Sequence, residues 1–591
     1  MWQLDDYPLA EEIGNPELFV GREQEMTRLL EWAEDAKRLQ SKSMGILSRR
    51  KKGKTALLQR FFNILYMRND PQLIPFYYRL PEKLQAESDF TEVFYRRTLT
   101  QYFAFTTRTP DWVRTVLSMD ELKELAASDR HLAEEIRNME DVQARAPTSA
   151  WPFAQEAAHR ISAAKDVRIL QILDEFQYMN KYVVSDADPQ RVALLCHSYM
   201  GPAESKYSPQ IVAGSYIGWM TEILRHLTAR YRRWHLGGFT DEEALEAVYT
   251  YAYAYRVPIT DETAPYIAEV CGGDPFYIAA TIANLPAEKD LTTEQGVRDA
   301  LTFETSVEDG EIAHTWGEYL ADAIDRVNTR ESPPQSPLGD VNAHKIVLYL
   351  AKHEPEERDR TQIHQDLKLD MTDSELAERL KKLVRADILA QGSSNFRYRG
   401  LGDRVFAMVF RRIYGEEIDR VTVEEIDEDF KRELATLKGR LSVHKGALAE
   451  HRVRYRLLVA SLRGATLADV VRDPRPGGIE PTTPIGPFKG IRKARFFLDH
   501  DTSREIDLHA ESEDKDRTDL MIEVKDWEKG PALDVVRRFI KVKKARESRL
   551  ERKTVFLFYS ESGLSEEAAA LLHEAGILVL DPQKLAGFEV F

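Results

Sequence analysis

The pattern of apolar and polar positions changes its period repeatedly along the chain. Short apolar runs that resemble buried strands occur at 44–47, 72–79, 167–173 and 209–215. Between these runs, apolar residues recur at helical spacing, as they do in the amphipathic segment 24–39. Strands that alternate with helices predict an α/β domain built on a parallel sheet.

The pattern is different after a proline-rich linker at 331–337. Two strands are expected within 388–410, on either side of a turn at 391–395. Before them, three helices are predicted at 344–352, 361–367 and 372–386, with Thr361 and Thr372 as N-caps. Three helices and a β-hairpin are typical of a winged helix, a fold that reads DNA in some proteins. Because the third helix mixes acidic with basic residues, an internal regulatory role stays open beside DNA binding.

The C-terminal part alternates strands and helices again. A helix is predicted over 445–462, followed by a loop rich in Pro and Gly over 473–490. Strands are expected at 494–498, 504–508, 519–525, 554–559 and 577–580, and helices at 533–549 and 565–576. This order predicts a second α/β domain, separate from the first.

Length and composition favour a soluble protein of about three to five domains, because the chain has 591 residues. The formal net charge is −16, so contact with DNA must come from local basic surfaces. Only Cys196 and Cys271 are present, which excludes a disulfide scaffold and favours a reducing cytoplasm. No targeting segment or apolar run of membrane-spanning length is found, so a cytoplasmic location without membrane contact is expected.

The segment Ser48–Thr55, SRRKKGKT, lies between a predicted strand and a predicted helix. This is the context of a phosphate-binding loop, in which backbone N–H groups and the helix N-terminus face a phosphate. Gly53 allows close approach of the backbone, Lys54 is expected to reach the β and γ phosphates, and Thr55 to hold Mg²⁺. Because Ser48 stands where this pattern usually has its first glycine, a solvated basic turn is the competing interpretation.

An acidic pair follows the strand 167–173. Asp174 and Glu175 lie where this strand ends, at the carboxyl edge where α/β sheets bind their ligands. We expect Asp174 to hold Mg²⁺ through water and Glu175 to orient the attacking water as a base. An exposed acidic pair that caps a helix is the structural alternative.

The ordered motifs of the first 300 residues resemble the archaeal-type ATPases of the STAND branch of AAA+ proteins. They are FVGRE (19–23), SRRKKGKT (48–55), ILDEFQYM (172–179), VAGS (212–215) and GGDPFY (272–277). The resemblance implies ATP and Mg²⁺ as cofactors, Ser215 as a sensor of the γ phosphate, and a helical lid. It also implies contacts of Gly21 and Arg22 with adenine and of the Pro275 region with the base.

In the same resemblance, the residues that hold the phosphates are Ser48, Gly53, Lys54, Thr55 and Ala56. The helix after Ser215 is expected to carry Arg225, Arg230, Arg232 and Arg233, any of which is a candidate arginine finger. Homo-oligomers are one expectation, because AAA+ relatives often form rings, and a resting monomer is the other.

Four residues of the C-terminal part form a second constellation. Glu450 is on the first helix, Asp507 is at the end of a strand, and Glu523 and Lys525 belong to Glu-Val-Lys on the next strand. The pleat places Glu523 and Lys525 on one face, where the carboxylates can share Mg²⁺ or Mn²⁺. This set resembles the PD-(D/E)XK nuclease fold, with Lys525 positioning or activating water and Glu450 completing the metal shell. A degenerate nuclease-like domain used for binding or packing is the alternative.

The predicted helix 533–549 is strongly basic. A basic helix next to such a site is expected to contact the phosphates of DNA. Its candidate residues are Arg537, Arg538, Lys541, Lys543, Lys544 and Arg546.

Together these patterns predict a multidomain α/β protein. Its expected parts are a P-loop AAA+ type ATPase core (1–235), a helical lid (236–330), a winged helix (331–415), a helical linker (416–444) and a restriction-endonuclease-like α/β domain (445–591). The predicted function is an ATP-binding and hydrolysing switch that controls a metal-dependent DNA endonuclease, for which the domain pairing favours defence against foreign DNA. The alternative is a nucleotide-gated DNA-binding or scaffolding protein with an inactive nuclease-like domain.

Overall fold

The computed structural model describes most of the chain, in two compact units. The core unit comprises Trp2–Gly238 and His314–Val423, and the C-terminal unit comprises Phe239–Ala313 and Glu424–Phe591. The described residues are 7–227, 230–283, 290–306, 310–320, 341–394, 396–419, 422–437, 445–474, 480–497, 503–514, 517–525, 530–547 and 552–588. The proline-rich linker predicted at 331–337 lies outside them.

A five-stranded parallel sheet forms the centre of the core unit. Its strands are β1 (Met44–Leu47), β2 (Leu73–Arg79), β4 (Arg168–Asp174), β6 (Gln210–Gly214) and β7 (Arg232–His235), in the order β2-β4-β6-β1-β7. Every pair of neighbours is parallel. The four strands predicted from apolar runs are confirmed, but β7 was not expected. Arg232 and Arg233 therefore lie exposed on a strand, and the prediction that they belong to a helix is wrong.

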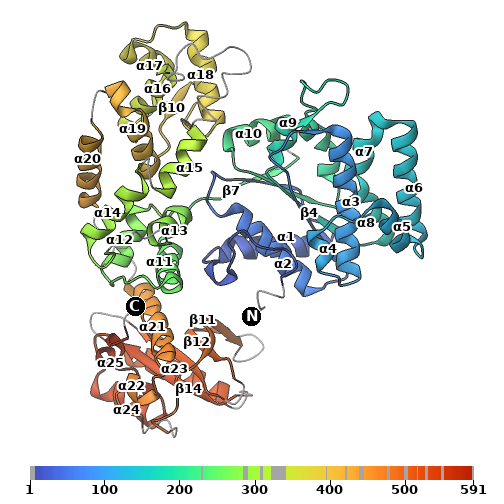
Figure 1. The fold of residues 1–591 in the computed structure, drawn as a ribbon. Coiled ribbons are helices and arrows are strands. Elements are labelled where there is room, and N and C mark those ends of the chain that lie inside the picture. Colours follow the sequence, from blue (N-terminus) through green and yellow to red (C-terminus); the bar gives the residue numbers. More distant parts are fainter. Residues whose placement is uncertain are drawn as a thin grey trace. The chain divides into compact units, whose positions relative to one another are not determined.

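Helices cover this sheet because each presents an apolar face to it. α1 (Glu23–Lys37), α2 (Lys54–Arg68) and α10 (Ile217–His226) contribute buried side chains to the same core cluster as the strands. An inserted group of helices gathers beside α3 (Glu87–Thr106) (Figure 1). This group comprises α4 (Asp111–Arg114), α5 (Met119–Ala126), α6 (Arg130–Arg145), α7 (Ala150–Gln155) and α8 (Ala157–Lys165).

The second part of the core unit, here called the helix–hairpin part, contains helices and a small sheet. The helices are α15 (Glu311–Leu320), α16 (Val341–Lys352), α17 (Arg360–Leu367), α18 (Asp373–Arg385) and α19 (Arg404–Asp419). The antiparallel sheet has the order β8-β10-β9, from β8 (Arg358–Asp359), β10 (Arg397–Arg399) and β9 (Ala390–Gln391).

Three details of the helix–hairpin part differ from expectation. Residues 404–410 form the start of α19, not a strand, because their apolar residues follow helical spacing and pack inward. The N-cap of α17 is Asp359, which accepts a hydrogen bond from the N–H of Gln362, and not Thr361. The strand β8 was not predicted, because two residues carry no periodic signal. Thr372 is the N-cap of α18, as expected.

The C-terminal unit begins with helices and ends in a mixed sheet. The first helices are α11 (Asp241–Tyr255), α12 (Thr263–Val270), α13 (Pro275–Ala283) and α14 (Glu294–Glu304), and α20 (Val423–Thr436) precedes α21 (Lys445–Leu462). The sheet order is β11-β12-β13-β14-β15, from β11 (Phe488–Phe497), β12 (Ser503–Ser512), β13 (Asp519–Lys525), β14 (Thr554–Ser560) and β15 (Leu578–Val579). The pairs β11–β12 and β12–β13 are antiparallel, and the remaining pairs are parallel.

Two apolar clusters cover the two faces of this sheet. α21 packs with Leu508, Ile522 and other strand residues in one cluster. α23 (Leu533–Glu547) and α24 (Glu566–Glu574) pack with Met521 and Phe558 in the other. The short helices α22 (Leu467–Val470) and α25 (Pro582–Ala586) complete the first cluster. The predicted strands and helices of this part are therefore confirmed, although β11 begins within the segment that was expected to be a loop.

Candidate functional site

The phosphate-binding loop links β1 to α2. Ser48 is fully buried at the end of β1, and its hydroxyl donates a hydrogen bond to the carbonyl of Arg49. Gly53 is the N-cap of α2 with φ +79°, and an added Cβ would meet no atom within 4 Å. Glycine is needed here for its left-handed conformation rather than for space. Lys54, Thr55 and Ala56 form the first turn of α2, where helix N–H groups are free to bind an anion.

Lys54 joins the loop to the acidic end of β4. Its ammonium group pairs with the carboxylate of Asp174 and lies 3.1 Å from Oε1 of Glu175. The Thr55 hydroxyl donates to Oδ2 of Asp174 over 2.7 Å. Burial by itself would lower the pKa of Lys54, but Asp174 and Glu175 outweigh it and raise that pKa. Lys54 therefore stays charged although it is 4% exposed.

Glu175 is held by several groups at once. Its carboxylate accepts hydrogen bonds from the hydroxyl of Ser215 and, over 2.6 Å, from Nε2 of Gln177. Its backbone is left-handed, with φ 54°, a conformation that is costly for a residue with a Cβ. Burial would raise the pKa of Glu175, but Lys54 and these hydrogen bonds lower it to about 2. Gln177 was not singled out from the sequence, because a lone glutamine after an acidic pair carries no recognisable spacing.

Arg22 joins the phosphate-binding loop to the segment that follows β7. Its guanidinium donates to the carbonyls of Lys52 and Gly237 over 2.9 and 2.8 Å. Gly21 and Arg22 both have positive φ, so the chain turns sharply just before α1. Pro275, which the resemblance also relates to the nucleotide, is buried at the start of α13 in the C-terminal unit.

Two arginines of the loop contact the helix–hairpin part, a relationship that no local spacing in the chain predicts. Nη1 of Arg49 lies 2.7 Å from Oδ2 of Asp403. Nη2 of Arg50 donates to the hydroxyls of Tyr178 and Tyr216 over 3.1 and 3.0 Å. The Arg50 guanidinium also lies 5.2 Å from the ring centre of Tyr319. The unusually basic loop is therefore explained in part by intramolecular partners.

The donor set of this site fits a nucleotide with Mg²⁺. A hydroxyl and a carboxylate from Thr55 and Asp174 are the oxygen ligands that Mg²⁺ prefers. Lys54, the N-terminus of α2 and the turn at Gly53 supply positive charge and N–H groups for phosphates. Ser215 lies at the neighbouring strand end, in contact with Glu175.

A second candidate site lies on the C-terminal sheet. Nζ of Lys525 lies 2.7 Å from Oδ2 of Asp507 and 2.9 Å from Oε1 of Glu523. Oδ2 of Asp507 also accepts the N–H of Val524 over 2.8 Å. Lys525 thus contacts both predicted carboxylates, which lie on two neighbouring strands. Asp507 lies within β12 rather than at its end, so that detail of the prediction is wrong.

An irregularity in β12 explains how Asp507 reaches this position. Arg492 pairs with His509 and Ala494 pairs with Ile506, so Asp507 and Leu508 together oppose the single residue Lys493. Such a bulge re-aims side chains and is common beside active sites. Lys493 in turn lies 2.8 Å from Oε2 of Glu450 on α21. Lys493 was missed in the sequence because it lies outside the expected motif.

Burial and mutual repulsion shape the electrostatics of these carboxylates. Burial and the nearby charge of Asp507 raise the pKa of Glu523 to about 7. Burial also raises the pKa of Glu450, although Lys493 opposes this. Burial would lower the pKa of Lys525, but Glu523 and Asp507 raise it. Carboxylates that repel one another in this way are stabilised by a nearby positive charge, which Lys493 and Lys525 supply here.

The carboxylates of this cluster are suitable ligands for a divalent cation, but they are not grouped around one point as metal ligands would be. Carboxylate oxygens of Glu450, Asp507 and Glu523 are suitable ligands for Mg²⁺ or Mn²⁺. Within the described ranges, no three acidic, His or Cys residues stand ready around one point as metal ligands. Lys525 and Lys493 neutralise the carboxylates instead, so these ammonium groups would have to yield to a metal.

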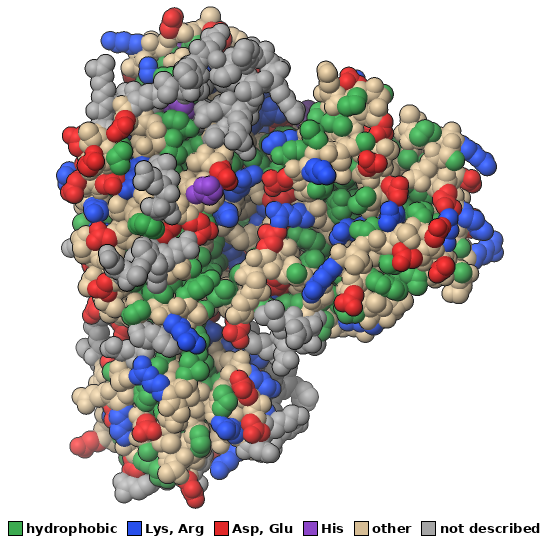
Figure 2. Space-filling view, viewed as in Figure 1, with side chains coloured by type: hydrophobic (Ala, Val, Ile, Leu, Met, Phe, Trp, Pro, Cys, Tyr) green, Lys and Arg blue, Asp and Glu red, His purple; other side chains and the backbone are tan. Residues whose placement is uncertain are grey.

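The basic helix α23 offers fewer free cations than its sequence suggests. Lys543 donates to the carbonyl of Ala575 over 2.6 Å and pairs with Glu547, so it stabilises its own domain. Arg537 and Arg538 are exposed, with Glu567 and Asp534 nearby. Lys541 and Lys544 are also exposed, and the side chain of Arg546 lies outside the described residues. On the face seen in Figure 2, Lys and Arg side chains are interspersed with Asp and Glu.

Comparison with known proteins gives similarity to solved structures alone. No protein-family model matches the chain, and no curated protein matches it. A Walker-type ATPase of Pyrococcus abyssi is 14% identical with a TM-score of 0.44, over 68% of this chain and 98% of that one. The ORC2 protein of Aeropyrum pernix is 14% identical with a TM-score of 0.35, over 70% and 95%. The RuvB Holliday junction branch migration motor of Thermotoga maritima is 14% identical with a TM-score of 0.27, over 66% and 95%.

No helix within the described ranges combines the length and the apolar character needed to cross a membrane.

Proposed function

We propose that this chain is an ATP-binding and hydrolysing switch that controls a metal-dependent deoxyribonuclease in its own C-terminal domain. The observation that carries the proposal is the contact of Lys525 with both Asp507 and Glu523, at 2.7 and 2.9 Å. Placing two acids and a lysine beside one another at a mostly buried position costs desolvation free energy, and a site that binds a charged ligand explains this cost more directly than packing does. The same reasoning supports the cluster of Lys54, Asp174 and Glu175 as a nucleotide site.

In the core unit, ATP binding is expected to redistribute charge. Lys54 leaves the carboxylate of Glu175 and turns to the β and γ phosphates, while Thr55 and Asp174 hold Mg²⁺. Once Lys54 has moved, the pKa of Glu175 rises from about 2, because Lys54 is the main group that holds it down. Glu175 then becomes a better acceptor for the proton of the attacking water. Ser215 and Gln177 keep its carboxylate in place.

In the C-terminal unit, the acidic cluster would hold Mg²⁺ or Mn²⁺ through Asp507, Glu523 and Glu450. The metal supplies a polarised water and neutralises charge on the scissile phosphate. Lys525 lies close enough to position that water or to contact the phosphate once its pairing with the carboxylates is released. Arg537, Arg538, Lys541 and Lys544 are the exposed cations of α23 that favour DNA as the substrate.

The helix α21 connects the second candidate site to α11, which belongs to the segment expected to form the lid (236–330). Its residue Glu450 belongs to the acidic cluster, whereas Arg454 pairs with Glu246 of α11 at 2.9 Å. The hydroxyls of Tyr455 and Thr250 lie 2.6 Å apart, and the Tyr455 ring stacks on Tyr249 at 5.6 Å. A movement of the lid would therefore move the helix that carries Glu450.

A second candidate function is a nucleotide-gated DNA-binding or scaffolding protein with an inactive nuclease-like domain. The observation that favours it is the neutralisation of Glu450 by Lys493 and of Glu523 by Lys525. In that case the lysines are permanent structural partners, and no metal displaces them.

Two measurements separate these functions. Calorimetric titration with Mn²⁺ is expected to give saturable binding that is lost in Glu523→Gln and strongly weakened in Asp507→Asn, with Glu513→Gln, directly after β12, as a control. Cleavage of plasmid DNA in Mg²⁺ or Mn²⁺ is expected to disappear in Lys525→Ala. Neither metal binding nor cleavage in the intact chain would favour the scaffold. Nucleotide binding, measured by equilibrium dialysis of ATP, is expected to fail in Lys54→Ala.

A further inference from the structure

The core unit contains a cavity of about 510 Å³ that the proposed function does not use. Four of its lining residues, Trp219, Glu222, Ile223 and His226, come from α10, and three, Lys382, Arg385 and Ala386, come from the end of α18. The rest come from α9 (Met179–Tyr182), from residues 194–197 and from Tyr216, the N-cap of α10. A volume of this size is typical of sites for small organic molecules.

The inner wall of the cavity is apolar and aromatic. Trp219 and Tyr216 have ring centres 6.2 Å apart, and Ile223 and Leu194 add aliphatic surface. Leu194 is 43% exposed and lines the cavity. His197 and His226 add two more rings, 4.9 Å apart. A flat apolar group has several ring faces here against which it can stack.

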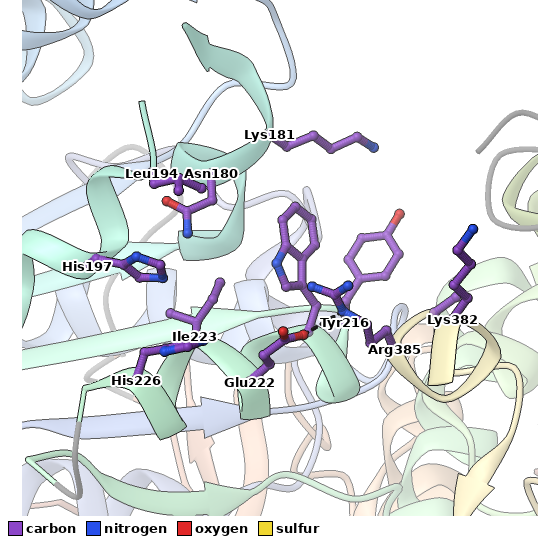
Figure 3. Close-up of a pocket in the computed structure, with 12 residues that line it drawn as sticks. Asn180, Lys181, Leu194, His197, Tyr216, Glu222, Ile223, His226, Lys382 and Arg385 are labelled. Carbon is purple, nitrogen blue, oxygen red and sulfur yellow. Dashed lines mark ion pairs between the residues drawn. The ribbon is translucent and has the colours of Figure 1, made fainter. Parts of the chain in front are cut away.

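The mouth of the cavity is positively charged. Lys181, Lys382 and Arg385 line it, against the single carboxylate of Glu222, which pairs with Arg385 at 2.5 Å. Figure 3 shows Lys181 and Lys382 extending from different elements toward the open side, with Asn180, His197 and Ile223 farther in. Oδ1 of Asn180 accepts the N–H of Cys196, so the Asn180 amide nitrogen is left as a donor on the wall.

From this combination we propose that the cavity binds a small, planar, anionic molecule of the nucleoside-phosphate kind. The ring would stack in the apolar interior, and the anionic group would pair with Lys181 and Lys382. The cavity is distinct from the phosphate-binding loop, because Arg49, Gly53 and Lys54 do not line it.

An occupant of this cavity would act on the candidate ATP site through α10 and α18. The carboxylate of Asp387, directly after α18, accepts the N–H groups of Ile217 and Gly218 at the start of α10, the latter over 2.9 Å. Ser215, which contacts Glu175, lies just before this point. A ligand that contacts both α10 and α18 would stabilise the arrangement in which Asp387 accepts these two N–H groups. The reason is that the ligand binds this arrangement better than one in which the two helices are apart. This proposal concerns the core unit alone, so it does not depend on whether the C-terminal domain cleaves DNA.

The test uses the full-length chain with its phosphate-binding loop saturated by a non-hydrolysable ATP analogue. A panel of AMP, GMP and cyclic di-AMP is titrated, and binding is followed by calorimetry and by quenching of tryptophan fluorescence. At least one member is expected to bind. Lys181→Gln and Lys382→Gln are each expected to weaken its binding about threefold to tenfold, as loss of one charge-assisted contact does. Trp219→Phe is expected to remove most of the quenching.

The matched control is Lys381→Gln, one residue from Lys382 on the same exposed stretch of α18 but not part of the lining. It is expected to leave binding unchanged. Absence of binding by the whole panel at millimolar concentration would overturn the proposal. Binding that Lys382→Gln and Trp219→Phe leave unchanged would also overturn it. Binding of a single-stranded oligodeoxynucleotide but of no member of the panel would likewise overturn it, and would indicate that the cavity is part of a nucleic-acid-binding surface. Circular dichroism of each variant verifies that it is folded.

Discussion

Arg49 of the phosphate-binding loop forms an ion pair with Asp403 at the start of α19, with 2.7 Å between Nη1 and Oδ2. Their side chains are 14% and 10% exposed, so the pair is largely shielded from water. The Arg49 guanidinium also lies 5.1 Å from the ring centre of Trp316 and 5.3 Å from that of Phe406. The loop that we assign to ATP is therefore held by the helix–hairpin part of the same unit.

Removing the negative charge of Asp403 is expected to lower the stability of the fold and to speed the release of nucleotide from the loop. Asp403→Asn leaves the Arg49 charge buried without its counter-ion, which is expected to cost about 2–3 kcal/mol of folding free energy. Urea unfolding measures this loss, and stopped-flow release of a fluorescent ATP analogue is expected to become faster. The exposed Asp370→Asn serves as the control. Equal stability and equal release rates in the two variants would contradict the role given to the pair.

The packing of α18 against α10 is expected to depend on pH through Asp387. Burial raises the pKa of Asp387 from 3.8 to about 7, although the N–H groups of Gly218 and Ile217 oppose this. The folded state thus binds a proton more tightly than the unfolded state. The resulting stabilisation is fully present below about pH 4 and is lost as the pH rises through about 7. The protection factors of the α10 amides, which correct hydrogen exchange for its base-catalysed intrinsic rate, are expected to be lower at pH 8 than at pH 6.

Asp387→Asn provides the check on this assignment. The amide side chain keeps an acceptor for the N–H groups but cannot ionise, so the difference in protection factor between pH 6 and pH 8 should disappear. A pH dependence that survives in Asp387→Asn would assign it to other groups.

The sequence predicted more of the framework than of the contacts. The strands β1, β2, β4 and β6 follow from their apolar runs, and Lys54, Asp174 and Glu175 follow from their positions at strand ends. The short edge strand β7 was missed, because RRWH contains only one buried residue. Partners far apart in the chain were also missed. Arg49 and Asp403 are 354 positions apart, and no local spacing connects them.

The second site shows the same limit. The Glu-Val-Lys segment on β13 and the helix with Glu450 were identified by their order along the chain. The contact between Lys493 and Glu450 depends on a β-bulge opposite Asp507, which is a property of strand register and not of composition.

Metal binding at the C-terminal cluster is expected to strengthen as the pH rises through about 7. Burial and Asp507 raise the pKa of Glu523 to about 7, and a metal ligand must be deprotonated. Between pH 6 and pH 7 the affinity for Mn²⁺ should therefore increase severalfold, with release of a proton that calorimetry in buffers of different ionisation enthalpy detects. In Asp507→Asn the pKa of Glu523 falls, and the remaining weak binding should lose this pH dependence. Affinity that is constant from pH 6 to pH 8 in the intact chain would contradict the assignment.

The contact between α11 and α21 is expected to matter for cleavage and not only for stability. Arg454→Glu places two acids together at the position of the Arg454–Glu246 pair, and their repulsion should separate α11 from α21. Exchange of the two charges, Glu246→Arg with Arg454→Glu, should restore the contact and with it the response of cleavage to ATP. A double-mutant cycle on the cleavage rate measures this coupling. Independent effects of the two substitutions would show that the pair does not transmit the signal.

The most direct test of ATP control is the rate of plasmid nicking by the full-length chain in Mg²⁺ or Mn²⁺, with and without ATP, for the wild type, Lys54→Ala and Lys525→Ala. The account predicts cleavage by the wild type at a rate that ATP changes, no response to ATP in Lys54→Ala, and no cleavage in Lys525→Ala. The same cleavage rate in Lys525→Ala, or the same response to ATP in Lys54→Ala, would contradict it.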